Sequence, residues 1–190
     1  MKSNKLNIFE LGLASLLAVT LGVVFWGWTF VYEFLNPFLS GLGMKYLSSG
    51  PWLMAAIIPA YIIRKPGVAF FSETVAAIVE GFIASWGLMA GVWGIAQGLG
   101  AELVFFGTRY KKWNIGTLIL ASHMSSTFSY CLDFFYYNYK TLSIQLNALQ
   151  LISFMVSSVI LCALPSYYLC KRLMKTGLLN NFRVVRGEDA

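Results

Sequence analysis

The stretch LGLASLLAVTLGVVFWGWTFVYEF, residues 11–34, decides the fold class of this chain. Glu33 is its only charged residue. A helix needs roughly 20 apolar residues to cross the ~30 Å hydrocarbon core of a bilayer, so this run is long enough to span it. The lysines that precede it would suit a signal peptide, but the run is too long for one and ends in no small-residue cleavage pattern. The stretch therefore predicts a transmembrane helix.

The composition of the whole chain extends this prediction. Of its 190 residues, 58% are hydrophobic and 12% are charged, whereas soluble domains carry about 25% charged residues. We expect one integral-membrane domain over residues 1–190. The three cysteines and the single histidine favour packing roles over a metal site. No ATP-binding loop and no metalloprotease or hydrolase motif is present, so the sequence predicts neither an enzyme nor a cofactor.

Polar breaks divide the chain into six apolar runs, near residues 9–34, 51–63, 67–86, 88–108, 115–137 and 143–170. The second run is short, so it must borrow flanking residues or lie inside the bundle. With a cytoplasmic N-terminus, only Lys45 and Lys140 of the 14 basic residues fall on the outer side. Lys2 and Lys5 then lie inside with the others. This asymmetry follows the positive-inside rule. It predicts an all-α protein of the cell membrane with six transmembrane helices and cytoplasmic termini, and it explains the net charge of +6 without nucleic acid.

The connection between the first two runs, about residues 35–51, differs from the others. It reads LNPFLSGLGMKYLSSGP, and its Asn-Pro pair and glycines predict that the helix is interrupted there. Its apolar residues indicate that it packs on the protein. Two interpretations remain open, an interfacial loop and a lid over an outward-facing cavity.

Small residues recur every four positions in the first run, at Ala14, Ala18 and Gly22. Such a stripe lets another helix approach closely. The pattern fits contact within the bundle and a docking face for a partner subunit equally well.

Carboxylates at membrane depth need a partner or a cavity, because an ionised acid in hydrocarbon costs at least a few kcal/mol. Glu73 and Glu80 are two helical turns apart, on one face and about 10 Å from each other. Glu80 falls in the outer third, where we expect a ligand. Glu73 lies deeper and is expected to pair with Arg64 or Arg109. Glu102 shares a helix face with Arg109, which predicts a second ion pair.

Hydrogen-bonding residues and tryptophans gather in the outer half of the predicted bundle. Aromatic walls with a few polar groups are typical of small-molecule sites, and aromatic faces beside a carboxylate suit a flat, cationic, nitrogen-rich ligand. The candidate ligand-binding residues are Glu80, Trp86, Trp93, Gln97, His123, Tyr130, Asp133 and Asn147. Tyr136, Tyr137 and Tyr139 are interpreted as an interfacial aromatic belt.

Two segments, IIRKPGVAFFSETVAA (62–77) and AQGLGAELVFFGTRYKKW (96–113), resemble the YkoE-type substrate-binding subunits of energy-coupling-factor vitamin transporters. The resemblance extends over essentially the whole chain. It implies a six-helix S-component with an outward site for thiamine or its hydroxymethylpyrimidine precursor, capped by the loop after the first helix.

The resemblance also implies partners and roles. The partners would be a transmembrane coupling subunit and ATPase subunits, so the chain would need no ATP site of its own. The stripe at Ala14 and Ala18 would be the face that contacts the coupling subunit. Thiamine-binding members of this class use a glutamate on the aminopyrimidine and aromatics around the thiazolium. Glu80, with Trp93, His123 and Tyr130, would fill these roles here.

Two other classes of function remain to be weighed against this one. The chain would be a ligand-free accessory subunit if it joined a membrane partner but responded to no vitamin. It would be an intramembrane enzyme if Glu80, His123 or Asp133 acted as acid–base groups on a bound molecule.

Overall fold

The computed structural model describes residues 6–186, and this part of the chain is helical throughout, with no strand. The all-α class is therefore confirmed, while Lys2, Lys5 and residues 187–190 lie outside the described residues. Eight α-helices follow one another: α1 (Ile8–Gly41), α2 (Met54–Ile63), α3 (Val68–Ile83), α4 (Ala90–Gly107), α5 (Ile115–Tyr136), α6 (Ile144–Ser157), α7 (Leu164–Lys175) and α8 (Arg183–Arg186).

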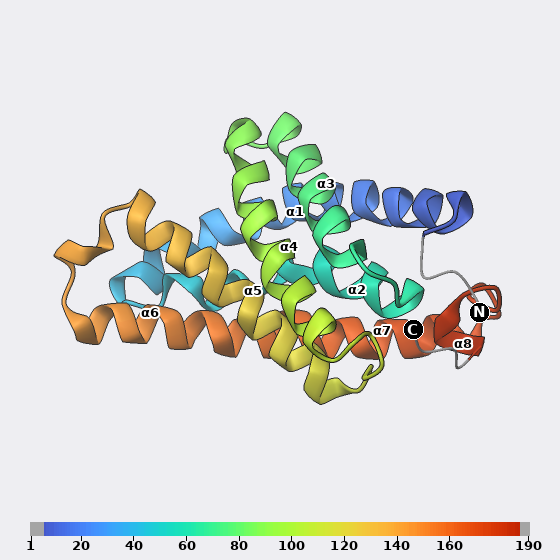
Figure 1. The fold of residues 1–190 in the computed structure, drawn as a ribbon. Helices are drawn as coiled ribbons and strands as arrows, with labels where there is room; N and C mark the ends of the chain where they lie inside the picture. The colour runs from blue at the N-terminus through green and yellow to red at the C-terminus, as the bar shows by residue number, and fades with distance from the viewer. Residues whose placement is uncertain (1–5, 187–190) are drawn as a thin grey trace.

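The helices form one bundle around α2 (Figure 1). The π-helical segment η5 (Ser158–Ala163) joins α6 to α7 in a single long rod, and α3 and α4 form a hairpin. Helix α1, helix α4 together with the turn before it (Gly87–Gly107) and the α6–α7 rod are each long and apolar enough to cross a membrane, by length and composition. Residues 55–63 of α2 are all buried, so this short helix is surrounded by protein and has no need to match the full bilayer thickness.

Helix α1 continues past the Asn-Pro pair, so the predicted break at residue 35 is wrong. Pro37 lies inside the helix, which ends only at Gly41. A proline removes one backbone N–H and displaces the carbonyl four residues earlier. Pro37 lies four residues before the end of α1, so most of this long helix is unaffected, and next to it the Ser40 hydroxyl donates to the Asn36 side chain at 2.8 Å. The connection that leads into α2 therefore spans residues 42–53.

The small-residue stripe of α1 faces inward. Ala14 and Ala18 are 0% exposed, and a Cβ added at Gly22 would lie 2.6 Å from the carbonyl oxygen of Ala76 in α3. The structure shows the first of the two interpretations, contact within the bundle, and a contact of Ala14, Ala18 and Gly22 with a partner subunit stays a prediction. The outward face of α1 carries large apolar side chains instead, among them Phe30 and Phe34.

Close packing of α4 on α3 brings the polar groups of both helices together. A Cβ at Gly94 would lie 2.5 Å from the Ala77 methyl group, and one at Gly98 would lie 2.9 Å from the Phe70 Cα. Only glycine permits this approach. The spacing of these glycines predicted close packing, and the structure confirms it.

Several turns rich in basic residues meet at one end of the bundle. Lys65 forms an ion pair with Glu10 at 2.6 Å. The Arg64 guanidinium lies 5.7 Å from the Trp113 ring centroid, and Arg183 donates to the Arg64 carbonyl at 3.3 Å. The start of α1, the α2–α3 turn, the α4–α5 turn and α8 are thereby joined at this end.

Glu102 caps α3 at the same end. Its carboxylate accepts hydrogen bonds from the backbone N–H groups of Gly67, Ala69 and Phe70, at 2.7, 3.0 and 3.3 Å, and from the Tyr110 hydroxyl at 2.6 Å. The first N–H groups of a helix lack intrahelical partners and favour negative charge. The predicted Glu102–Arg109 ion pair is therefore wrong, because α3 supplies better donors.

Candidate ligand-binding site

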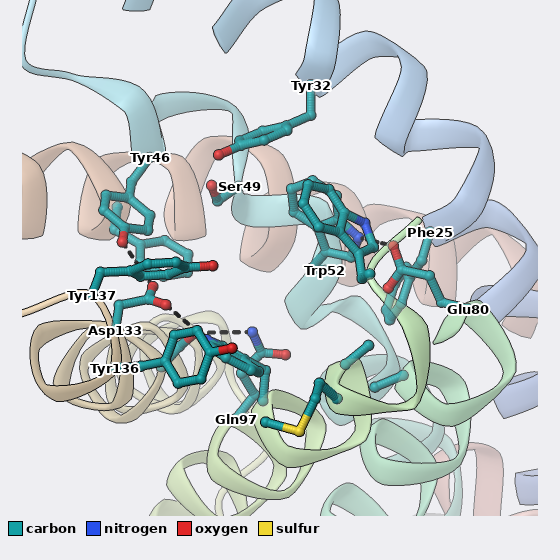
Figure 2. Close-up of a pocket in the computed structure, with 17 residues that line it drawn as sticks. Phe25, Tyr32, Tyr46, Ser49, Trp52, Glu80, Gln97, Asp133, Tyr136 and Tyr137 are labelled. Atoms are coloured by element: carbon teal, nitrogen blue, oxygen red, sulfur yellow. Dashed lines mark hydrogen bonds between the residues drawn. The ribbon is translucent and has the colours of Figure 1, made fainter. Parts of the chain in front are cut away.

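A pocket of about 200 Å³ lies between α1, α3, α4, α5 and the connection 42–53 (Figure 2). Aromatic side chains form most of its walls, and a few polar groups converge on it. The aromatic residues are Phe25, Tyr32, Tyr46, Trp52, Trp86, Trp93, Tyr136, Tyr137 and Phe154, and the polar ones are Ser49, Glu80, Gln97, Ser129 and Asp133. This composition is typical of a small-molecule site.

Glu80 forms one polar wall of the pocket from the last turn of α3. Its Oε1 accepts hydrogen bonds from the Trp52 indole at 2.7 Å and from the Thr29 hydroxyl at 3.1 Å. The Trp86 indole in turn donates to Thr29 at 3.3 Å. Because both bonds to the carboxylate use Oε1, Oε2 remains available as an acceptor at the pocket wall.

Gln97 supplies a second acceptor, from α4. Its side-chain Nε2 donates to the Ser129 hydroxyl at 3.0 Å, and its backbone carbonyl accepts from Ser125 at 2.7 Å. The amide is thus held by α5 through its nitrogen. Its oxygen lies at the pocket (Figure 2), on the side toward Glu80.

Asp133 forms the opposite polar wall, from α5. Its Oδ2 accepts from the Tyr46 hydroxyl at 2.7 Å, and its Oδ1 accepts from the Trp93 indole at 2.8 Å. Burial, followed by the charge of Asp133, raises the pKa of Tyr46, so its hydroxyl stays protonated as a donor. Tyr46 also stacks on Phe154, with ring centroids 5.1 Å apart. Asp133 therefore ties the connection 42–53 to α4 and α5.

Five of the eight predicted ligand-binding residues line this pocket: Glu80, Trp86, Trp93, Gln97 and Asp133. The other three do not. His123 bonds Ser158 of η5 at 2.9 Å, and the Tyr130 hydroxyl donates to the Asn147 side chain at 2.7 Å. These residues were assigned by depth, which does not tell toward which neighbour a helical side chain points. The structure places His123, Tyr130 and Asn147 in contacts between α5 and the α6–α7 rod.

Sequence reasoning missed the pocket residues that come from α1 and from the connection, namely Phe25, Tyr32, Tyr46, Ser49 and Trp52. The apolar character of that connection was the available signal, because it indicated a segment packed on the protein. Tyr136 and Tyr137 line the pocket as well, although the sequence suggested only an interfacial belt.

Glu73 was expected to pair with an arginine. The structure buries it completely, at 0% exposure, and neither carboxylate oxygen has a hydrogen-bond partner among residues 6–186. That prediction is wrong. Glu80 lies at the pocket and Glu102 caps the start of α3. Glu73 lies in the apolar interior between these two sites.

The helical membrane fold and its aromatic, carboxylate-bearing pocket define a membrane protein that binds a small substrate. Residues 10–128 match the family model described as "ABC-type cobalt transport system, permease component". The chain is 34% identical to the "Putative HMP/thiamine permease protein YkoE" of Bacillus subtilis (strain 168) over 181 residues. This alignment covers 95% of this chain and 89% of the relative.

A solved structure shows the same fold. A crystal structure of an S-component of an ECF transporter superposes with a TM-score of 0.87 at 31% sequence identity, covering 96% of this chain and 93% of that one. The chain belongs to the YkoE-type S-components of energy-coupling-factor transporters. It is a substrate-binding transport subunit and not an enzyme.

Proposed function

We propose that this protein captures thiamine or its hydroxymethylpyrimidine precursor from outside the cell and delivers it with an ATPase-driven coupling module. The pair of open acceptors, Glu80 Oε2 and the Gln97 side-chain oxygen, carries the proposal. The similarity to the HMP/thiamine permease protein YkoE of Bacillus subtilis supports it.

The chemistry of the ligand matches these acceptors. An aminopyrimidine presents an exocyclic amine and a flat ring. The amine would donate to Glu80 and Gln97, in charge-assisted and neutral hydrogen bonds. The ring would lie among tryptophan and tyrosine faces, with Trp52 and Trp86 on the Glu80 side and Trp93 on the Asp133 side. A thiazolium ring would gain further from these faces through cation–π attraction.

The proposed topology follows the charges. Six spans would cross the cell membrane, with α1, α2 together with its preceding turn, α3, α4, α5 and the α6–α7 rod in order. The gathered basic end would be cytoplasmic, which places both termini inside and the pocket toward the outside. Residues 1–190 would form one domain, and the connection 42–53 would cover the pocket as a lid.

The proposed partners are a transmembrane coupling subunit and ATPase subunits, together with the surrounding bilayer. The likeness to an S-component of an ECF transporter supports them. The stripe at Ala14, Ala18 and Gly22 is the face proposed for the coupling subunit, and Ala14 and Ala18 are covered by the bundle in this conformation.

Ligand titration of the purified protein tests the proposal. Trp52, Trp86 and Trp93 surround the pocket, so thiamine and hydroxymethylpyrimidine should each quench tryptophan fluorescence saturably. Co²⁺ forms a third arm, because the matching family model is described as a cobalt permease. No response to either organic ligand at millimolar concentration would refute the thiamine assignment. Saturation by Co²⁺ alone would point to the metal instead.

A further inference from the structure

We propose that the pocket selects its ligand by charge, with Asp133 providing the preference for a cation and Lys45 limiting it. The inference rests on the proposed function, because it concerns which form of the vitamin the same pocket prefers.

Two carboxyl groups line the pocket. Glu80 and Asp133 are 4% and 5% exposed, and among residues 6–186 no lysine, arginine or histidine lines the pocket. Asp133 accepts its two hydrogen bonds from a phenol and an indole. These donors are neutral, so they satisfy its oxygens without cancelling its charge.

The Lys45 ammonium is held beside the Asp133 wall, outside the cavity. The Lys45 ammonium lies 4.8, 5.1 and 4.9 Å from the ring centroids of Tyr46, Tyr137 and Tyr139, and it contacts the Tyr139 hydroxyl. Tyr46 and Tyr137 also line the pocket, so this three-tyrosine cage separates the ammonium from the ligand. The cage holds Lys45 in place by cation–π attraction.

The charges then leave one negative charge for the ligand to balance. With Glu80 and Asp133 both ionised, these two carboxylates and the Lys45 ammonium give a single net negative charge in a partly desolvated site, where charge interactions are stronger than in water. A monocation such as thiamine balances it, a neutral pyrimidine leaves it uncompensated, and a phosphate ester adds repulsion. The expected order of affinity is thiamine, then hydroxymethylpyrimidine, then thiamine monophosphate.

A pair of isosteric ligands isolates the charge. In 3-deazathiamine a carbon replaces the charged ring nitrogen of thiamine, so the ratio of its Kd to that of thiamine measures the preference for a cation. We expect a ratio of about tenfold or more in the unmodified protein. Asp133→Asn keeps the side-chain shape and should bring the ratio close to one.

Lys45→Gln should raise the ratio of the 3-deazathiamine Kd to the thiamine Kd by about threefold, because it removes the compensating positive charge. Lys140→Gln is the matched control, since Lys140 is exposed near the same end of the protein and does not line the pocket. Its ratio should equal that of the unmodified protein.

The outcomes separate the two proposals. If the unmodified protein binds neither thiamine nor hydroxymethylpyrimidine, the proposed function fails. If thiamine binds but the ratio is near one, or Asp133→Asn leaves it unchanged, charge selection alone is overturned. If Asp133→Asn abolishes all binding, the ratio measured for Lys45→Gln tests charge selection instead. A ratio above that of the unmodified protein supports the proposal, and an equal or lower ratio overturns it.

Discussion

A carboxylate lies at each end of α3, Glu102 of α4 at its start and Glu80 in its own last turn, and their surroundings differ. At the basic end, Glu102 accepts three backbone N–H bonds and one hydroxyl bond, so its acceptors are occupied by the protein. Near the other end, both bonds to Glu80 use the same oxygen, and the second oxygen is left at the pocket wall. A carboxylate whose acceptors are all bonded by the protein stabilises the fold. A carboxylate with an open acceptor beside a cavity is suited to binding a ligand.

Glu73 lies between them and follows neither pattern. It is 0% exposed, and its carboxylate has no hydrogen-bond partner among residues 6–186. Burying an unpaired polar group costs free energy. Glu73 is thus expected to weaken the fold, in contrast to Glu102, and to contribute nothing directly to a ligand, in contrast to Glu80.

Glu102→Ala should have the largest effect. It leaves three N–H groups of α3 and the Tyr110 hydroxyl without their acceptor, so we expect the free energy of unfolding to fall by about 3 kcal/mol. The midpoint of thermal unfolding in detergent measures this. Glu33→Ala, on the exposed side of α1, is the control. An unchanged midpoint together with lost thiamine binding would reverse the roles assigned to Glu102 and Glu80.

Glu80→Gln should act on binding and spare the fold. The amide keeps an oxygen for Trp52 and Thr29 but turns the open acceptor into a donor that faces the ligand amine. We expect the Kd for thiamine to rise about 30-fold, or ~2 kcal/mol, while the thermal midpoint stays close to that of the unmodified protein. Equal losses of affinity in Glu80→Gln and Glu33→Gln would remove Glu80 from the site.

Glu73→Met should raise stability. Replacing an unpartnered buried carboxyl with an apolar side chain of similar length removes its desolvation cost, and we expect the free energy of unfolding to rise by about 1 to 1.5 kcal/mol. Thermal unfolding in detergent again provides the measurement. A clear drop in the midpoint would show that Glu73 has a stabilising partner and would end the contrast with Glu102.

Tyr110→Phe should have the smallest effect. It removes one of four hydrogen bonds to Glu102 and leaves the three backbone bonds to α3, so the expected loss is about 0.5–1 kcal/mol. Burial, followed by the bond to Glu102, raises the pKa of Tyr110, which keeps its hydroxyl a donor. A loss as large as that of Glu102→Ala would mean that the hydroxyl, and not the helix cap, is the main stabilising contact.

Much of the fold could be predicted because it depends on patterns along the chain. The six apolar runs correspond to the helical stretches of the structure, and the glycines of α4 mark the close contact with α3. The break at Pro37 was predicted wrongly, because a proline in a last helical turn interrupts few hydrogen bonds. The stripe at Ala14, Ala18 and Gly22 showed that a helix packs there but could not show which one.

The candidate site was predictable in part. Depth along each helix brought Glu80, Trp86, Trp93, Gln97 and Asp133 into one list, and all five line the pocket. The same depth criterion also selected His123, Tyr130 and Asn147, which point to other neighbours and do not line the pocket. The connection 42–53 contributes Tyr46, Ser49 and Trp52. Its sequence has no periodicity from which the direction of these side chains could be predicted.

By itself, the sequence determined the helical membrane class, the order of the helical stretches and the asymmetry of charge, since each depends on composition and spacing along one chain. Only the tertiary structure decided which acceptors are occupied. Glu102 accepts from the free N–H groups at the start of α3, Glu73 has no hydrogen-bond partner among residues 6–186, and Glu80 keeps one oxygen open. These outcomes depend on how neighbouring helices are rotated and how closely they approach, and hydrogen bonds are made or lost over fractions of an ångström.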